Sequence, residues 1–324
     1  MNNKYEYEKY ICDKETLEFT LKNYGVAIIP NVLDENECKL MVNGIWDFLE
    51  YITQEWPIPL NRHDEKTWIK FYKLYPLHSM LLQYWGVGHA QISWNIRQNL
   101  KIVEIFAHFW KCSVNDLLVS FDGLSFNLPP EITKRGWNKN NTWYHTDQSF
   151  TTPEFKCIQS LITGIDINDG DATLSILEGS NKYHNNFKEK FNVTNKKDWY
   201  KLNKEEEQFY IDKGCSYKNI KCPKGSLVFW DSRTIHCGIE ASKGRLIPNF
   251  RAVIYLCYMP RSLSSKAQLK KKQKAFNELR TTSHYPCKIK LFGKLPYTHG
   301  EDIPQVKPTI TPELNDLGKK LAGF

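Results

Sequence analysis

His145, Asp147 and His236 have the residue types and the spacing of a metal site. The segment that starts at His145 favours a β-strand, in which alternate side chains share one face. His145 and Asp147 could therefore bind one metal ion while Thr146 points away, and His236 on a distant strand would complete three ligands. Two imidazoles and one carboxylate on one side of an octahedron leave three positions open, which is typical of non-haem Fe(II) oxygenases. The spacing thus predicts oxygen chemistry.

The sequence around His236 suits a ligand held at the end of a strand. An apolar run at residues 227–230 ends in a polar turn, and the turn is followed by His-Cys-Gly. Cys237 lies next to the histidine. Adjacent strand residues face opposite sides, so we do not expect Cys237 to bind the metal.

A later strand carries an arginine suited to a carboxylate. Residues 251–258 form an apolar run with turn-forming residues on both sides, and Arg251 shares a face with Val253 and Tyr255. The planar fork of a guanidinium matches a carboxylate, as a dicarboxylate cosubstrate requires. Arg245 is the alternative anchor, and we favour Arg251 because it alone opens an uninterrupted strand.

Several other polar residues have a functional and a structural interpretation. Asn127 and Gln148 could contact a cosubstrate, although hydrogen bonding within the core explains them equally well. His89, His184 and His284 are not spaced as ligands with one another, so we expect each to be a structural histidine.

Beyond these residues, the chain resembles the phytanoyl-CoA dioxygenase-like branch of the Fe(II)- and 2-oxoglutarate-dependent dioxygenases. The resemblance extends from about residue 20 to the end of the chain, and many relatives place the arginine closer to the second histidine. It implies that His145, Asp147 and His236 bind iron and that Arg251 binds the distal carboxylate of 2-oxoglutarate. The blocks that carry it are Gly86–Gln91, Trp94–Gln98, Ser120–Gly123, Trp143–Ser149, Leu177–Lys182, Trp230–Arg233 and Thr281–Pro286.

The resemblance implies an enzyme that uses Fe(II), 2-oxoglutarate and O2, with ascorbate to keep the iron reduced. Such an enzyme would hydroxylate an unactivated C–H bond of a small-molecule substrate and release succinate and CO2. A nucleic acid or protein side chain is an alternative substrate, which only the net charge of +8 supports. A non-catalytic jelly-roll binding protein is a further alternative. Loss of catalysis typically shows as a missing ligand, whereas all three ligands and an arginine are present.

Composition favours a folded protein inside the cell. The chain has 324 residues, of which 41% are hydrophobic and 14% aromatic. It has no apolar run near 18 residues and begins with a polar, charged segment, so we expect neither a membrane span nor a secretory signal. Nine cysteines without a Cys-x-x-Cys pair indicate reduced thiols. We therefore expect a cytoplasmic or nuclear protein.

The pattern of elements predicts a mainly β, α+β protein with a jelly-roll, double-stranded β-helix core and surrounding helices. We expect one domain over residues 1–324, with a helical insertion at about 181–221 and a C-terminal helical extension from about 262. In the extension, Lys270–Lys272 should lie on the solvent side of a helix. Helices are expected at 15–23 and from 34 to about 50, and strands at 25–30, 117–121, 145–150, 159–165, 173–177, 225–230 and 251–258.

Overall fold

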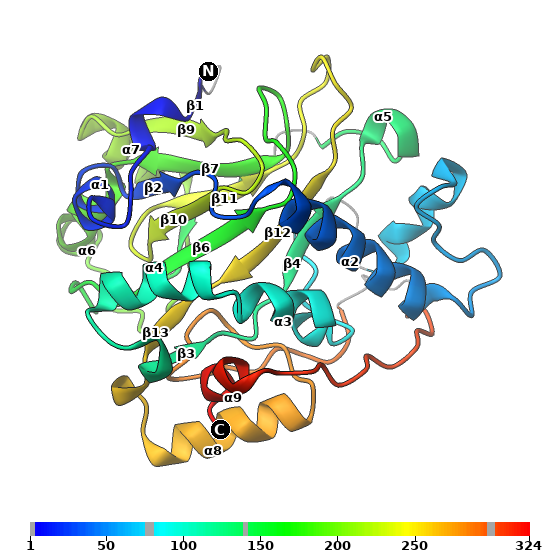
Figure 1. Ribbon diagram of the computed structural model, residues 1–324. Coiled ribbons are helices and arrows are strands. Elements are labelled where there is room, and N and C mark those ends of the chain that lie inside the picture. The colour runs from blue at the N-terminus through cyan, green and yellow to red at the C-terminus, as the bar shows by residue number, and fades with distance from the viewer. Residues whose placement is uncertain (1–3, 75–80, 139–141, 297–301) are drawn as a thin grey trace.

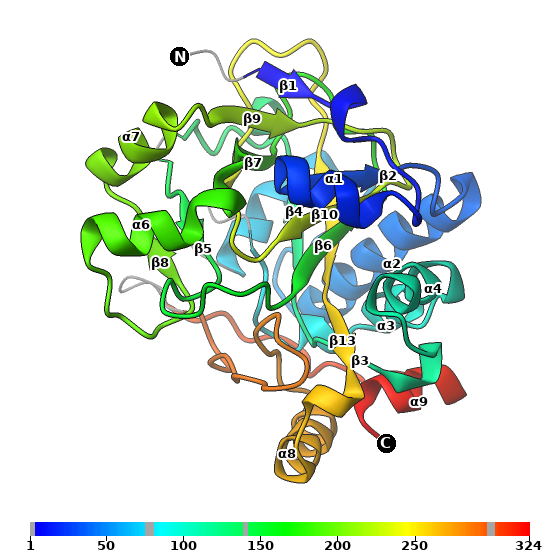
Figure 2. The ribbon, with the colours of Figure 1, turned by 90° about the vertical axis from the view of Figure 1, so that its left-hand side faces the viewer.

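The computed structural model describes residues 4–74, 81–138, 142–296 and 302–324. Two large β-sheets face each other and helices cover their outer sides (Figures 1 and 2). The predicted mainly β architecture with a jelly-roll core is confirmed. One sheet has the order β1 (Lys4–Glu6), β9 (Ser216–Ile220), β7 (Thr173–Glu178), β11 (His236–Ile239), β5 (His145–Thr146) and β8 (Tyr200–Lys201). The other has the order β2 (Val26–Ile29), β10 (Leu227–Asp231), β6 (Ile158–Thr163), β12 (Arg251–Leu256) and β4 (Leu124–Asn127), and β13 (Tyr258–Pro260) pairs separately with β3 (Leu117–Val119).

The helices surround this core. They are α1 (Leu17–Tyr24), α2 (Glu35–Thr53), α3 (Gln91–Arg97), α4 (Leu100–Trp110), α5 (Pro130–Thr133), α6 (His184–Phe191), α7 (Lys204–Asp212), α8 (Lys266–Asn277) and α9 (Asp316–Ala322). Short 3₁₀ helices lie at Glu8–Tyr10, Glu65–Lys73, Val87–His89, Val114–Asp116, Ser180–Tyr183 and Arg261–Leu263. In the part of the chain that the structure describes, no helix is long and apolar enough to cross a membrane.

The five-stranded sheet is buried on both faces. On β10, Val228 and Trp230 face the opposite sheet, while Leu227 and Phe229 pack in the cluster that includes α2, α3 and α4. Figure 1 shows these helices lying across the sheet. A strand covered on both faces needs apolar residues at every position, which explains the continuous apolar run at 227–230.

The strand predicted at 145–150 is shorter than expected, because β5 ends at Thr146. The Thr146 hydroxyl accepts a hydrogen bond from the backbone N–H of Gln148 at 3.2 Å. The Ser149 hydroxyl accepts one from the backbone N–H of Thr151, also at 3.2 Å. Such side-chain bonds to nearby backbone compete with strand pairing. The chain therefore turns at Asp147 instead of continuing along the sheet.

The charged segment at 181–221 is more than a set of helices. It contains α6 and α7, but it also contains β8 and β9, and β9 pairs with β7 inside the six-stranded sheet. The segment thus carries helices as predicted, together with two strands that the sequence did not predict. The polar residues of β9 hid it from a search for apolar strands.

Helix α8 departs from the expectation that Lys272 faces solvent. Lys272 is fully buried, its ammonium group donates to the Val119 carbonyl oxygen, and it lies 3.9 Å from the centre of the Phe121 ring. A buried cation loses its stabilisation by water, and the interaction with an aromatic face replaces part of that loss. Lysine in a charged run can therefore belong to the core.

A candidate metal centre between the sheets

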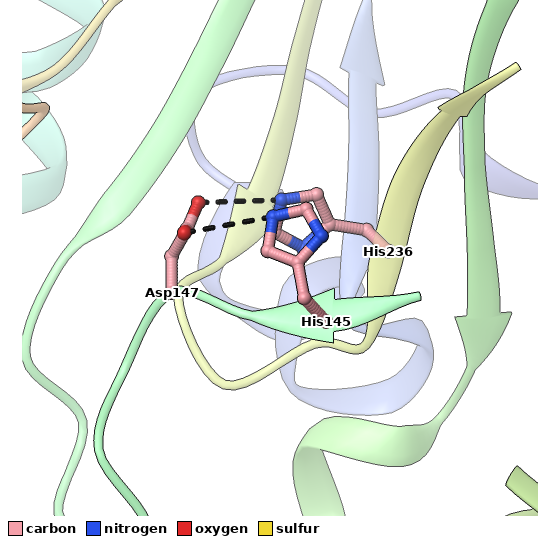
Figure 3. Close-up of side chains that lie close together, drawn as sticks. All are labelled: His145, Asp147 and His236. Carbon is pink, nitrogen blue, oxygen red and sulfur yellow. Dashed lines mark ion pairs between the residues drawn. The ribbon is translucent and has the colours of Figure 1, made fainter. Parts of the chain in front are cut away.

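Three side chains converge between the strands at one place. His145 Nε2 lies 3.6 Å from Asp147 Oδ1, and His236 Nε2 lies 3.4 Å from Asp147 Oδ2 (Figure 3). One nitrogen or oxygen atom from each residue lies within 4.8 Å of the other two. The structure therefore brings together all three residues that the sequence predicts as ligands.

Strand register places the two histidines side by side. His145 on β5 and His236 at the start of β11 are direct partners in the antiparallel ladder, so their side chains are nearest neighbours on one face. Asp147 reaches the same point from the turn after β5. It comes from that turn, not from a strand face as the spacing suggested.

Each histidine is held in the form that binds a metal through Nε2. Nδ1 of His145 donates to the Trp143 carbonyl oxygen at 3.1 Å, and Nδ1 of His236 donates to the Thr234 carbonyl oxygen at 2.9 Å. A carbonyl can only accept, so the proton of a neutral ring sits on Nδ1 and the lone pair of Nε2 faces Asp147.

Electrostatics also favour the metal-binding forms. Burial and the nearby His236 lower the pKa of His145. Burial alone would raise the pKa of Asp147, but the neighbouring imidazoles of His145 and His236 hold it well below its usual range. Both shifts favour the unprotonated groups that a metal ion requires. The donor set fits a hard or borderline divalent cation such as Fe(II).

Asp147 is oriented by two residues that sequence reasoning missed. The Gln159 amide on β6 donates to Asp147 Oδ2 at 2.9 Å, and the Tyr285 hydroxyl donates to the Asp147 carbonyl oxygen at 3.0 Å. Gln159 opens a predicted strand, and Tyr285 lies in the block Thr281–Pro286, so the sequence singled out both segments. Nothing in either segment indicated a contact with Asp147.

Replacing Gln159 with leucine should weaken metal binding about tenfold, because a group that orients a ligand typically contributes ten- to hundredfold in affinity. The affinity would be measured by titrating the apo-protein with Mn(II). Ser160→Ala is a matched control, since the Ser160 hydroxyl on the same strand bonds the Leu256 carbonyl oxygen instead. Equal Mn(II) affinity in the wild type and Gln159→Leu would contradict the assigned role.

The two candidate arginines both line one small cavity, but they differ in their partners. The buried Arg245 bonds the carboxylate of Glu131 at 2.7 and 3.0 Å and that of Asp171 at 2.8 Å. Arg251 is 4% exposed, and the partners given by the structure are neutral: the Ser125 hydroxyl at 3.0 Å and the Ala172 carbonyl oxygen at 3.1 Å. A buried cation among neutral groups favours an anion beside it.

Asn127 and Gln148, the other two residues predicted to bind a cofactor, have different surroundings in the structure. Asn127 is the direct ladder partner of Arg251 and lines the same cavity. Gln148 is fully buried, and its amide nitrogen donates at 2.6 Å to both the Thr152 and the Glu154 carbonyl oxygens. Its side-chain oxygen accepts from Ser232. All side-chain polar atoms of Gln148 thus have partners within the protein, which favours hydrogen bonding within the core over binding of a cosubstrate.

Aromatic side chains surround the two histidines. Trp143 stacks on His145 with ring centres 4.7 Å apart and an interplanar angle of 6°. Trp199, from the segment between α6 and β8, lies 5.7 Å from His145 between ring centres and is 52% exposed. His145 and His236 have side chains only 5% and 6% exposed, whereas that of Asp147 is 17% exposed. Asp147 is therefore the most exposed of the three converging side chains.

The remaining histidines have different surroundings. His89 is fully buried, with Nε2 bonded to the Arg280 carbonyl oxygen at 3.0 Å and Nδ1 facing the Trp94 indole nitrogen at 3.4 Å. Its predicted structural role is confirmed. Nε2 of His184 bonds the Ser149 carbonyl oxygen at 3.1 Å. His284, by contrast, lies near the metal centre, where Asp147 and His236 are among the charged groups that act on its ring.

Comparisons with known proteins agree with this geometry. The family model described as phytanoyl-CoA dioxygenase matches residues 21–242, which include the three converging residues. The Ava biosynthesis cluster protein O of Aspergillus versicolor is 24% identical over 270 residues, which cover 81% of this chain and 83% of that protein.

Two solved structures share the fold. The putative oxidoreductase of Salmonella typhimurium LT2 superposes with a TM-score of 0.58 at 12% identity, over 97% of this chain and 86% of that one. The GlcNAc Inducible Gene 2 protein of Candida albicans gives a TM-score of 0.56 at 13% identity, over 83% of this chain and 70% of that one.

Proposed function

Because the chain belongs to the phytanoyl-CoA dioxygenase family, we propose that it is an Fe(II)- and 2-oxoglutarate-dependent oxygenase that hydroxylates a small molecule. The convergence of His145, Asp147 and His236 carries the proposal. Two neutral imidazoles and one carboxylate hold the iron from one side and leave positions for a cosubstrate and O2. Bound iron, with 2-oxoglutarate and O2, supplies the oxidising power for an unactivated C–H bond and releases succinate and CO2.

Arg251 binds the distal carboxylate of 2-oxoglutarate in this proposal. Its guanidinium contacts the carbonyl oxygen of Ala172, which lies four residues before Ile176 on β7, and Ile176 is the ladder partner of His236. Four strand residues span about 13 Å, which a five-carbon dicarboxylate can bridge together with the ligand and arginine side chains at its two ends. Asn127, across from Arg251, lies close enough to help orient the same group.

The protein positions the reacting groups and limits the access of water to the histidine ligands. The histidine ligands are almost fully buried, and Trp143 shields one face of His145. Excluding water strengthens the charge interactions that hold the cosubstrate, and it limits wasteful side reactions. The name of the fungal relative refers to a biosynthesis cluster, which supports a small-molecule substrate.

Anaerobic addition of Fe(II) and 2-oxoglutarate to the apo-protein should produce a weak visible absorption band, because chelation of iron by a keto acid creates a charge-transfer transition. Admission of O2 in the presence of ascorbate should then yield succinate. His236→Ala should show neither signal. A wild-type protein that binds Fe(II) yet shows no band and forms no succinate would refute the proposal.

Hydroxylation can be tested separately from the use of 2-oxoglutarate. With a metabolite panel and isotopically labelled O2, one labelled oxygen atom should enter the product and one should enter succinate. A product without labelled oxygen would keep the oxygenase assignment but exclude hydroxylation as the outcome.

A further inference from the structure

The C-terminal extension places a histidine with an unpartnered ring nitrogen beside the metal centre. Nε2 of His284 is buried and has no hydrogen-bond partner in the described part of the chain. The ring centre of His284 lies 4.1 Å from that of Tyr285, whose hydroxyl bonds the Asp147 backbone. The coil that holds both residues, orange in Figure 2, follows α8.

A buried polar atom without a partner is uncommon in native proteins, because it has lost its hydrogen bonds to water without replacing them. His89 shows the usual outcome, since both of its ring nitrogens face partners. His284 differs from it by lying close to Asp147, the most exposed of the three converging residues. A molecule bound there could supply the missing partner.

A second feature points to the shape of that molecule. Trp199 is 52% exposed although it lies beside the metal-facing His145. Large aromatic side chains gain most when their faces are covered, and another ring is a favourable cover. Trp199 therefore offers a flat, exposed apolar surface beside the metal centre.

Outside the metal centre, the charged groups that act on the His284 ring are Lys156 and Asp198, and these two pair with each other. Lys156 lies 2.9 Å from the Asp198 carboxylate, and its ammonium also lies 4.2 Å from the centre of the Tyr285 ring. Opposite charges that neutralise each other leave little net field for an ionic ligand. The surroundings of His284 therefore suit an uncharged group.

We propose that His284 is a substrate-binding residue whose Nε2 atom forms a hydrogen bond with a hydroxyl or carbonyl oxygen of an uncharged, ring-containing substrate. Trp199 packs against the ring of that substrate. The inference rests on the proposed function and deepens it by naming the substrate class. His284 lies outside the residues matched by the family model. Together, His284 and Trp199 fix which C–H bond faces the metal.

The test uses the full chain loaded with Mn(II) and 2-oxoglutarate, and two uncharged probes, 2-tetralol and tetralin. The probes share their rings and differ by one hydroxyl group. Mn(II) broadens the nuclear magnetic resonance lines of nearby protons, so a titration reports both the affinity and the position near the metal. Wild-type protein should bind 2-tetralol about tenfold more tightly than tetralin, which is the effect of one well-placed hydrogen bond.

Variants separate substrate binding from a structural role. His284→Ala should remove the preference for 2-tetralol while the Mn(II) content remains that of the wild type. His284→Gln should restore most of the preference, because its amide nitrogen can occupy the place of Nε2, whereas His284→Asn, whose amide is shorter, should not. Trp199→Ala should lower the affinity for both probes to a similar extent.

Two results would overturn the inference: a wild-type protein that binds the two probes within about twofold of each other or binds neither, and a His284→Ala variant that keeps the preference. Either result leaves the proposed function intact if wild-type protein with Fe(II) still converts 2-oxoglutarate to succinate. Failure of that conversion as well would reject the proposed function itself.

Discussion

His236→Ala should lower the affinity for Mn(II) or Fe(II) by more than about a hundredfold. The substitution removes one of three protein ligands, and even residues that only orient a ligand contribute ten- to hundredfold. His145→Ala should behave alike, because the two histidines are ladder partners on the same face. Metal content after dialysis and titration with Mn(II) would measure both effects.

Cys237→Ala provides the matched control for this experiment. Cys237 is the next residue along β11, and it packs on the outer face of the sheet in the cluster that includes Phe187 and Tyr210. Its removal should lower thermal stability slightly without changing metal content. Wild-type metal content in both His145→Ala and His236→Ala would mean that the converging residues do not hold the metal.

Arg251→Ala should raise the apparent Michaelis constant for 2-oxoglutarate by hundreds-fold, while metal binding should be retained. Breaking a buried pair between a guanidinium and a carboxylate costs about 3 to 5 kcal/mol, which corresponds to at least hundreds-fold in affinity. Arg251→Lys should recover only part of this loss, because an ammonium group lacks the planar fork. Succinate formation as a function of 2-oxoglutarate concentration would give the values.

Arg245→Ala should show the opposite profile. Its guanidinium already bonds Glu131 and Asp171, so its loss should lower the melting temperature and leave the constant for 2-oxoglutarate near that of the wild type. The reverse ranking, with Arg245→Ala defective in cosubstrate use and Arg251→Ala normal, would move the carboxylate anchor to Arg245.

The histidines of the metal centre could be found from the sequence because their environment leaves a local pattern. An apolar run and a turn precede His236, and β10 is apolar throughout because both of its faces are buried. The same reasoning placed Asp147 beside the two histidines, but its reason was incomplete. Its position depends on hydroxyl-to-backbone bonds of Thr146, which end the strand early.

Other features could not be predicted because they depend on contacts between distant segments. Gln148 looked available for a ligand until the fold placed two carbonyl oxygens and the Ser232 hydroxyl around its amide. Lys272 looked solvent-exposed because its charged neighbours set the local pattern, whereas its position on the helix sets its burial. The meeting of Tyr285 with Asp147 joins residues far apart in the chain, and nothing near either residue indicates it.

The brevity of β5 has a consequence for the apo-protein. The strand has only two residues, and its link to β11 is the single pair His145 and His236. So short a ladder contributes little cooperative stability of its own, and regions of this kind are the first to open in local fluctuations. A metal ion bound by both histidines would tie the two strands together and stabilise the closed arrangement in proportion to its affinity. The ion would thus link the two neighbouring strands of the six-stranded sheet that share the fewest residue pairs.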